Sequence, residues 1–296
     1  MDISVVIPVY KNTEEFLKNL KHNMQFLKGM EIILVNDDPE TSLKEHVKEY
    51  SNIILLENSV NIGFGQTVNR GIGKATHSYI LLLNTDVLLQ DQSFEEGIKR
   101  FQEDKNMFGI SFEQIERDGS LVGKNKLFWE NGFATHSKAD NLEYGPNGWV
   151  ECGSCLIDTE KFKLIGGFDP LYSPVYWEDV DLSYRARKNG FIALFDPAIK
   201  VIHHHESTTG KYFTKDYIKT IAFRNQLIFI WKNVEDKKLM QEHIFALAKL
   251  LVGSIIKGDR VVLKGFWAAL MKWNAIQEKR REQKKFNKLN DRELLA

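Results

Sequence analysis

The feature that most constrains the fold is a repeat over residues 3–86: a short apolar run, a polar loop and an amphipathic stretch. The first run, residues 3–9, is continuous and is typical of a parallel strand buried in a sheet. Similar runs occupy residues 31–35, 53–56 and 79–83. The alternation predicts an α/β fold with a Rossmann-like, mostly parallel sheet flanked by helices.

Polar residues follow directly where these apolar runs end. In open α/β sheets, ligands bind beyond the carboxyl ends of the strands. A polar binding site is therefore expected among the residues that end the runs, which are Tyr10, Asp37, Asp38, Asn84 and Asp86.

The middle of the chain, residues 108–202, is less regular. We expect strands near residues 109–112 and 154–157, and a helix at residues 179–189 that Gly190 ends as a C-cap. We predict a domain boundary after this part, between a domain of residues 1–208 and a helical region of residues 209–296. The helical region is expected to hold three helices, at residues 215–231, 235–256 and 260–285.

Charge is distributed unevenly, although the whole chain is formally neutral. Residues 206–296 carry 19 Lys and Arg against 10 Asp and Glu, so the first 205 residues carry 21 against 30. The acidic residues 1–205 favour binding of a divalent cation, and the basic residues 206–296 favour contact with an anionic surface. A solvated helical surface explains the basic excess equally well. Overall neutrality argues against nucleic acid as a partner.

The cysteines and the N-terminus indicate a reducing compartment. Only Cys152 and Cys155 are present, so no disulfide framework is expected. We interpret both as small buried residues on a strand at residues 152–157, with a redox or zinc role as the alternative. The chain begins without a basic, apolar, cleavable segment, and it has no stretch of about 18 uncharged apolar residues. We expect a cytoplasmic protein.

Three polar clusters carry the candidate chemistry. The first is Asp86, after a buried strand, where a carboxylate can hold Mg²⁺ or Mn²⁺; a turn or capping role is the alternative. The second is the acidic start of the helix at 179–189, where Asp179 could accept a proton as a general base. The third is the His203–His204–His205 run, in which His203 or His205 could complete a metal site.

These clusters together resemble the family 2 glycosyltransferases of the GT-A fold. The resemblance covers residues 3–208 and rests on the opening strand Val5–Tyr10, the glycine turn at Asn61–Gly65, and Asn84-Thr85-Asp86 in place of a DxD motif. It also rests on Gly166–Asp169 with Trp177-Glu178-Asp179-Val180-Asp181, and on His203 after them. The Asn-x-Gly-Phe turn and the Trp-Glu-Asp-x-Asp segment are similar to those of rhamnosyl- and galactofuranosyltransferases.

The resemblance implies a nucleotide-sugar donor and one role for each matching residue. The nucleoside would be surrounded by Pro8, Val9, Tyr10 and Asp37. The donor pocket would be lined by Asn61, Gly63 and Asn69. Asn84 replaces the first acid of the motif, so it could bind a ribose but adds no charge. The metal ligands would be Asp86 and His203, with Mn²⁺ or Mg²⁺ bridging the diphosphate.

On the acceptor side, the resemblance makes Asp179 the general base, with Trp177 and Glu178 shaping the acceptor pocket. The implied reaction is a single displacement that inverts the anomeric centre. The donor would be dTDP-rhamnose or a UDP-sugar, and the acceptor a saccharide or lipid-linked hydroxyl in cell-surface polysaccharide synthesis.

Two questions stay open from the sequence. The basic helices after residue 235 interleave Trp and Leu with Lys, which suits a peripheral contact with the inner face of the cell membrane; packing on the catalytic domain or a homodimer interface is the alternative. A nucleotidyltransferase would show a glycine-rich first loop, which Pro8-Val9-Tyr10-Lys11 is not. A non-catalytic saccharide-binding relative would be expected to have lost Asp86 or Asp179.

Overall fold

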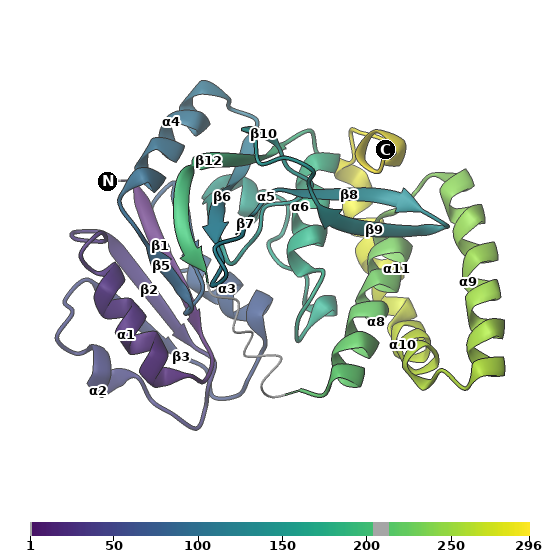
Figure 1. The fold of residues 1–296 in the computed structure, drawn as a ribbon, viewed down its shortest axis with the longest axis horizontal. Helices are drawn as coiled ribbons and strands as arrows, with labels where there is room; N and C mark the ends of the chain where they lie inside the picture. The colour runs from purple at the N-terminus through teal and green to yellow at the C-terminus, as the bar shows by residue number, and fades with distance from the viewer. Residues whose placement is uncertain (1, 204–212) are drawn as a thin grey trace.

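A computed structural model describes residues 2–203 and 213–296. Its centre is a ten-stranded sheet (Figure 1). Four strands are parallel and run in the order β3-β2-β1-β4, which confirms the predicted fold class. They span β1 (Ile3–Val9), β2 (Glu31–Asn36), β3 (Ile53–Glu57) and β4 (Tyr79–Leu83).

The second half of the sheet is mixed. Strand β11 (Ser154–Asp158) pairs antiparallel with both β4 and β6 (Met107–Ile115), and β12 (Ile192–His203) is parallel to β6. Three short strands complete the edge: β5 (Val87–Leu89), β7 (Leu121–Val122) and β10 (Gly145–Pro146). Because β5 pairs with the end of β12, the cross-strand partner of His203 is Val87, the residue after Asp86.

Helices cover both faces of the sheet, because alternate strand residues face opposite ways. Val5 and Ile7 pack in one core with the helices α1 and α4, while Val6 packs in another with α3, α5 and α6. The helical segments of this part are α1 (Thr13–Asn23), α2 (Lys44–Val47), α3 (Phe64–Ile72), η1 (Ser93–Glu95), α4 (Glu96–Glu103), α5 (Thr159–Leu164), η2 (Pro170–Tyr172) and α6 (Glu178–Lys188).

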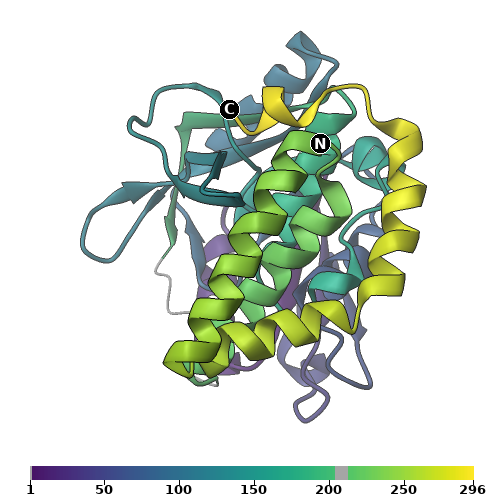
Figure 2. The ribbon, with the colours of Figure 1, turned by 90° about the vertical axis from the view of Figure 1, so that its right-hand side faces the viewer.

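The C-terminal helices pack beside the sheet, on the side that carries the separate hairpin of β8 (Asn125–Glu130) and β9 (Phe133–Lys138) (Figures 1 and 2). They form α8 (Lys215–Asn233), α9 (Lys237–Lys257), α10 (Arg260–Leu270), α11 (Trp273–Gln283), η3 (Lys284–Phe286) and α12 (Asp291–Leu294). Helix α8 is the most enclosed, since Leu227, Ile228, Phe229 and Ile230 are all fully buried. The predicted boundary at residue 208 stays a prediction, although α8 shares a hydrophobic core with α6.

One helix expectation was wrong: the predicted helix at residues 260–285 is two helices. The chain turns at Met271 and Lys272. Here Lys272 N donates to Ala269 O, three residues earlier, instead of to a carbonyl four residues earlier as in an α-helix. The break lets both pieces pack on α8. The Trp231 ring contacts Phe266 of α10 and Trp273 of α11, with ring centroids 6.2 and 5.5 Å apart.

Candidate active site

A cavity of about 420 Å³ opens beyond the carboxyl ends of β1, β2 and β4, where the sequence places its polar residues. Most of the predicted site residues meet there, from six separate parts of the chain. The predicted residues that line it are Pro8, Val9, Tyr10, Asp37, Asn61, Gly63, Asn84, Asp86, Glu178, Asp179 and His203.

Asp86 and His203 form a pair on the cavity wall. The His203 Nε2 atom lies 3.2 Å from Asp86 Oδ1, and the ring is almost fully buried, whereas the Asp86 side chain is 21% exposed. On the other side of the ring, Nδ1 lies 2.8 Å from Gln114 Oε1. When Nδ1 donates to this amide oxygen, the Nε2 atom of a neutral ring has its lone pair directed toward Asp86 and the cavity.

The pair fits a divalent metal. Two neighbouring ligands of one octahedral ion, each about 2.1 Å from it, lie about 3 Å apart, and the Asp86–His203 separation matches this. Within residues 2–203 and 213–296, no group of three or more His, Cys, Asp or Glu side chains could hold a metal. Most of the shell would therefore come from water and substrate phosphate, as is usual for Mg²⁺. The alternative ligand His205 lies outside the described residues.

Gly153 makes room for this pair. A Cβ atom at Gly153 would lie 2.8 Å from His203 Cε1 and 3.3 Å from Asn84 Nδ2. The Gly153 carbonyl also accepts from Asn84 N, which fixes the turn that presents Asp86. Any larger residue here would displace His203 or Asn84, so the glycine is needed for the shape of the site.

Asp179 lies in the first turn of α6 and opens into the same cavity. Burial, and then the negative charge of Glu151, raise the pKa of Asp179 to about 7. Its Oδ1 accepts from the Val180 amide at 2.8 Å, which holds the carboxylate at the positive end of the helix. A carboxyl with a pKa near neutrality is suited to exchange a proton with a bound ligand.

Glu178, beside it, also lines the cavity. Burial, followed by the charge of Asp179, raises the pKa of Glu178 well above its usual value. Its Oε2 atom has no hydrogen-bond partner within the part of the chain that the structure describes. A protonated Glu178 would be an uncharged neighbour of a partly ionised Asp179.

The residues that precede α6 hold a strained backbone. Tyr176 and Trp177 both have φ of +71°, a conformation that bulky residues rarely adopt and that costs about 1–3 kcal/mol for each residue. Asn225 of α8 stabilises this segment, because its Nδ2 donates to the carbonyls of Tyr172, Val175 and Tyr176 at 2.8–2.9 Å. Helix α8 therefore fixes the start of the helix that carries Asp179.

Asp37 shapes the opposite wall of the cavity. Its Oδ1 accepts from Asn58 Nδ2 and Ile62 N, and its Oδ2 accepts from Gly63 N, all at 2.7–2.9 Å. Gly63 has φ of +83°, and a Cβ there would lie 2.8 Å from Ser173 Oγ. Asp37 thus holds the glycine turn, and its carboxylate retains acceptor capacity for a ligand because it can accept about four hydrogen bonds.

Two predicted residues do not line the cavity. Asn69 is occupied by the backbone of Phe168: its Nδ2 donates to Phe168 O and its Oδ1 accepts from Phe168 N. Trp177 is buried, with its ring 5.2 Å from Phe229 and 5.3 Å from His136. Asn69 therefore joins α3 to the Gly-Gly-Phe-Asp turn, and Trp177 anchors the start of α6 in the core beneath the cavity.

Several cavity residues were not predicted from the sequence. Glu151 matters most, since its charge acts on Asp179; its only signal was a position just before a strand. The others are Phe64, Thr67, Thr85, Cys152, Gly153, Pro174, Val175, Tyr176 and Phe213. Cys152 and Cys155 are buried free thiols, as expected, but only Cys155 lies on β11, because the strand begins at Ser154.

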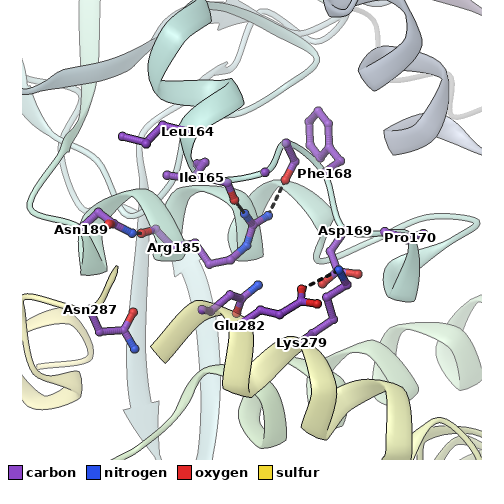
Figure 3. Close-up of a pocket in the computed structure, with 13 residues that line it drawn as sticks. Leu164, Ile165, Phe168, Asp169, Pro170, Arg185, Asn189, Lys279, Glu282 and Asn287 are labelled. Carbon is purple, nitrogen blue, oxygen red and sulfur yellow. Dashed lines mark hydrogen bonds and ion pairs between the residues drawn. The ribbon is translucent and has the colours of Figure 1, made fainter. Parts of the chain in front are cut away.

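A second, smaller cavity of about 190 Å³ lies between the Gly166–Gly167 turn and α11 (Figure 3). None of the predicted site residues line it. Arg185 occupies its wall by donating to the carbonyls of Ile165 and Gly167. The Arg185 guanidinium is thus used to hold the turn, and the candidate chemistry lies in the larger cavity.

The fold and cavity together define an α/β protein with a polar ligand site at the carboxyl ends of its strands. The chain belongs to the glycosyl transferase family 2, whose model matches residues 4–164. The resemblance inferred from the sequence motifs is thereby confirmed. Asp179 and His203 lie beyond the matched residues.

Curated relatives agree with this family. The chain is 28% identical over 195 residues to an N-acetylglucosaminyl-diphospho-decaprenol L-rhamnosyltransferase of Mycobacterium tuberculosis, covering 56% of the chain and 63% of that relative. The match thus spans less than two thirds of the relative's length. The chain is also 30% identical over 240 residues to a dolichyl-phosphate beta-glucosyltransferase of Trichomonas vaginalis, and this match covers 69% of the chain and 73% of that relative.

Solved structures share the GT-A fold. The structure of GalNAc-T7 with UDP, GalNAc and Mn²⁺ matches 80% of this chain and 48% of its own, with a TM-score of 0.64 and 16% identity. A mannosyltransferase from Pyrobaculum calidifontis in complex with GDP-Man and Mn²⁺ matches 92% and 86%, with a TM-score of 0.55 and 11% identity. At these identities the likeness shows the fold alone.

Proposed function

We propose that this glycosyltransferase is metal-dependent and inverting, and that it transfers a sugar from a nucleotide diphosphate to an acceptor hydroxyl. One observation carries the proposal: the Asp86–His203 pair, whose histidine is buried, and Asp179, a carboxyl with a pKa near 7, line the same cavity. The pair supplies a site for cationic help to a phosphate leaving group, and the carboxyl supplies a base.

The metal would be Mn²⁺ or Mg²⁺, held by Asp86 Oδ1 and His203 Nε2. When bound, such an ion neutralises charge that develops on a departing diphosphate. Gln114 keeps the His203 ring in place through Nδ1, as partners behind a metal ligand usually do. Two relatives in fold are complexed with Mn²⁺, which supports a divalent metal here without choosing between the two ions.

Asp179 would be the general base. The acceptor oxygen attacks the anomeric carbon while the bond from that carbon to the diphosphate oxygen breaks, and the acceptor proton passes to Asp179. Because attack comes from the face opposite the leaving group, the anomeric configuration inverts. A base with a pKa near 7 is partly ionised at neutral pH, and general-base help is typically worth about 10²–10⁴-fold. Glu178 would contact the acceptor beside it.

The donor would lie along the first two strands, with the nucleoside near Tyr10 and Asp37 and the ribose near Asn84. Pro8, Val9, Asn61 and Gly63 would complete this wall. We favour dTDP-rhamnose or a UDP-sugar. The M. tuberculosis relative is named as a rhamnosyltransferase acting on a diphospho-decaprenol acceptor, which supports a lipid-linked acceptor and a role in cell-surface polysaccharide synthesis.

We also propose that the protein acts in the cytoplasm, with its C-terminal helices in peripheral contact with the membrane. In residues 2–203 and 213–296, α9 alone is long and apolar enough to cross a membrane by length and composition. Only 22% of the most apolar stretch of α9 is buried. The helix contains Lys249, so it does not contradict the observation that the sequence has no stretch of about 18 uncharged apolar residues. A homodimer through these helices is the competing arrangement.

A panel of nucleotide sugars tests the proposal. With Mn²⁺ present, one donor among dTDP-rhamnose and the UDP-sugars should raise the melting temperature and be slowly hydrolysed, and EDTA should abolish both effects. If every donor fails with both Mn²⁺ and Mg²⁺, the donor assignment is wrong. Donor binding that EDTA leaves unchanged would remove the metal from the proposal.

A further inference from the structure

The outer face of α9 is apolar where a soluble helix is usually polar. Its buried residues, His243, Leu247 and Ser254, recur at i, i+4 and i+11 and so lie on one side. The opposite side carries large apolar residues that are 58–80% exposed, namely Ile244, Phe245, Val252, Ile255 and Ile256. A helix that is apolar on both sides needs a second apolar environment.

The inner side of α9 already has its partner. His243 accepts from Trp231 Nε1 of α8 at 3.0 Å, and its Nδ1 lies 2.8 Å from Gly132 O in the β8–β9 hairpin. Glu242 also accepts from Trp129 of the same hairpin. The inner side of α9 is therefore held against α8 and the hairpin, and its outer side remains exposed. Figure 1 shows α9 at the edge of the molecule.

Helix α10 extends this apolar surface. Gly258 and Asp259 connect it directly to α9, and Figure 2 shows it crossing the lower end of α9. Trp267 is 60% exposed and Met271 is 87% exposed. We call this surface the α9–α10 face; it consists of Ile244, Phe245, Val252, Ile255, Ile256, Trp267, Leu270, Met271 and Trp273.

Charge around the α9–α10 face selects its partner. Residues 243–273 contain five basic side chains, Lys249, Lys257, Arg260, Lys264 and Lys272, against a single acid, Asp259. That acid caps α10 through the amides of Val261 and Val262. Exposed apolar side chains with Trp, bordered by Lys and Arg, match the interface of a bilayer with anionic headgroups. Two copies of this face would instead bring like charges together.

Helix α8 links the catalytic cavity to helix α10. Phe213 lines the cavity and stacks on Tyr217 in the first turn of α8, with ring centroids 5.0 Å apart. One turn further, Thr220 contacts α10, because a Cβ atom at Gly265 would lie only 3.0 Å from Thr220 O. The first turns of α8 therefore link the cavity to the buried side of α10, and the exposed residues of the α9–α10 face lie on the outer side of the same helix.

We propose that the α9–α10 face docks on an anionic membrane surface and so keeps the catalytic cavity, which α8 links to α10, near the bilayer. This inference rests on the proposed function for its purpose, which is to present the cavity to an acceptor hydroxyl carried on a lipid. The chain would lie on the membrane without crossing it, because α9 remains packed on α8 and on the hairpin.

Vesicle sedimentation of the full chain tests this proposal. The chain should sediment with vesicles of phosphatidylcholine and 30 mol% phosphatidylglycerol, weakly with phosphatidylcholine alone, and should be released by 0.5 M salt. Replacing Lys257, Arg260 and Lys264 by Gln should weaken binding on the order of 100-fold, since each charge near such a surface contributes about fivefold. Substitution of Lys48, Lys99 and Lys105 by Gln is the charge-matched control and should leave binding intact.

A second variant tests the apolar part. Ile255→Ser with Ile256→Ser should weaken vesicle binding at least tenfold, because each loses a side chain that would enter the interface. Leu121→Ser with Leu164→Ser removes two exposed leucines elsewhere, which are 45% and 59% exposed, and should bind normally. Circular dichroism should show the wild-type fold in all four variants, since every substituted side chain is exposed.

Three results would overturn the proposal. The first is no binding to anionic vesicles. The second is a stable dimer in light scattering that Ile255→Ser with Ile256→Ser converts to a monomer, which would make the face an interface between copies. The third is binding that resists both salt and alkaline carbonate, which would indicate insertion across the bilayer. Vesicle binding requires no donor, so loss of metal-dependent donor binding would overturn the proposed function and leave this inference standing.

Discussion

Lys232 should be the most sensitive charged residue of the fold outside the catalytic cavity. Its side chain is fully buried, and its Nζ lies 2.7 Å from Asp169 Oδ2 and 2.6 Å from Asp181 Oδ1. Arg185 is the second cation of the cluster, with Nε 2.8 Å from Asp181 Oδ2. The two cations and the two carboxylates balance, so replacing Lys232 by Met leaves one uncompensated buried negative charge.

The size of the effect follows from that imbalance. Breaking a buried ion pair by removing one partner typically costs about 3–5 kcal/mol, a large share of the about 5–15 kcal/mol that stabilises a typical domain. Asp169→Asn removes the excess charge. The Leu171 amide donates to Asp169 Oδ1, and an asparagine oxygen can accept the same bond. The double variant should therefore be more stable than the sum of the two single effects predicts, by about 0.5–3 kcal/mol.

Urea unfolding followed by circular dichroism measures all four members of this cycle. Lys232→Met should shift the midpoint to lower urea with little change in slope, and adding Asp169→Asn should recover part of the shift. Strict additivity of the two single variants would refute the charge-balance reasoning. A Lys232→Met chain as stable as the wild type would refute the importance of the cluster itself.

Three further predictions concern pH and metal. Burial opposes ionisation of Asp181, but Arg185 and Lys232 outweigh it and hold the pKa of Asp181 at about 2. The ionised Asp181 should therefore contribute about 2–3 kcal/mol to the free energy of unfolding above pH 4, and this contribution should disappear between about pH 4 and pH 2. Unfolding midpoints that stay constant over this pH range would contradict the prediction. Glu151→Gln should lower the pKa of Asp179 and move the acidic limb of the kcat/KM profile to lower pH. The pKa should stay above the usual aspartate value, because burial is the larger cause of the shift. An acidic limb that does not move would show that Glu151 has no effect on the catalytic ionisation. Asp86→Ala should weaken Mn²⁺-dependent nucleotide binding at least tenfold in calorimetry, and unchanged affinity would remove Asp86 from the metal site.

The parallel half of the sheet could be predicted from sequence because each strand is a short apolar run between polar loops. A strand buried on both faces is apolar along its whole length, as β1 and β4 show, so it can be recognised without knowing which strands pair with it. The carboxyl ends of such strands meet at one edge, so the amino-acid pattern alone was enough to place Asp37 and Asp86 in one site.

What a side chain contacts could not be read from the sequence in the same way. Asn69 has the right polarity and position for a donor pocket, yet a backbone segment about 100 residues away takes both of its amide atoms. Glu151 belongs to no motif, and its effect on Asp179 arises because the two residues line the same cavity in the folded chain. The break between α10 and α11 depends on packing around Trp231, which the helical pattern of residues 260–285 does not encode.

The central claim is that Asp179 is the base of an inverting transfer. The most direct test compares Asp179→Asn with the wild type in two measurements: donor binding by calorimetry with Mn²⁺, and release of nucleoside diphosphate in the presence of acceptor. Asp118→Asn, at an exposed turn, is the matched control. We predict donor binding within about twofold of the wild type and transfer reduced by about 10²–10⁴-fold. Turnover at the wild-type rate in Asp179→Asn would contradict the claim.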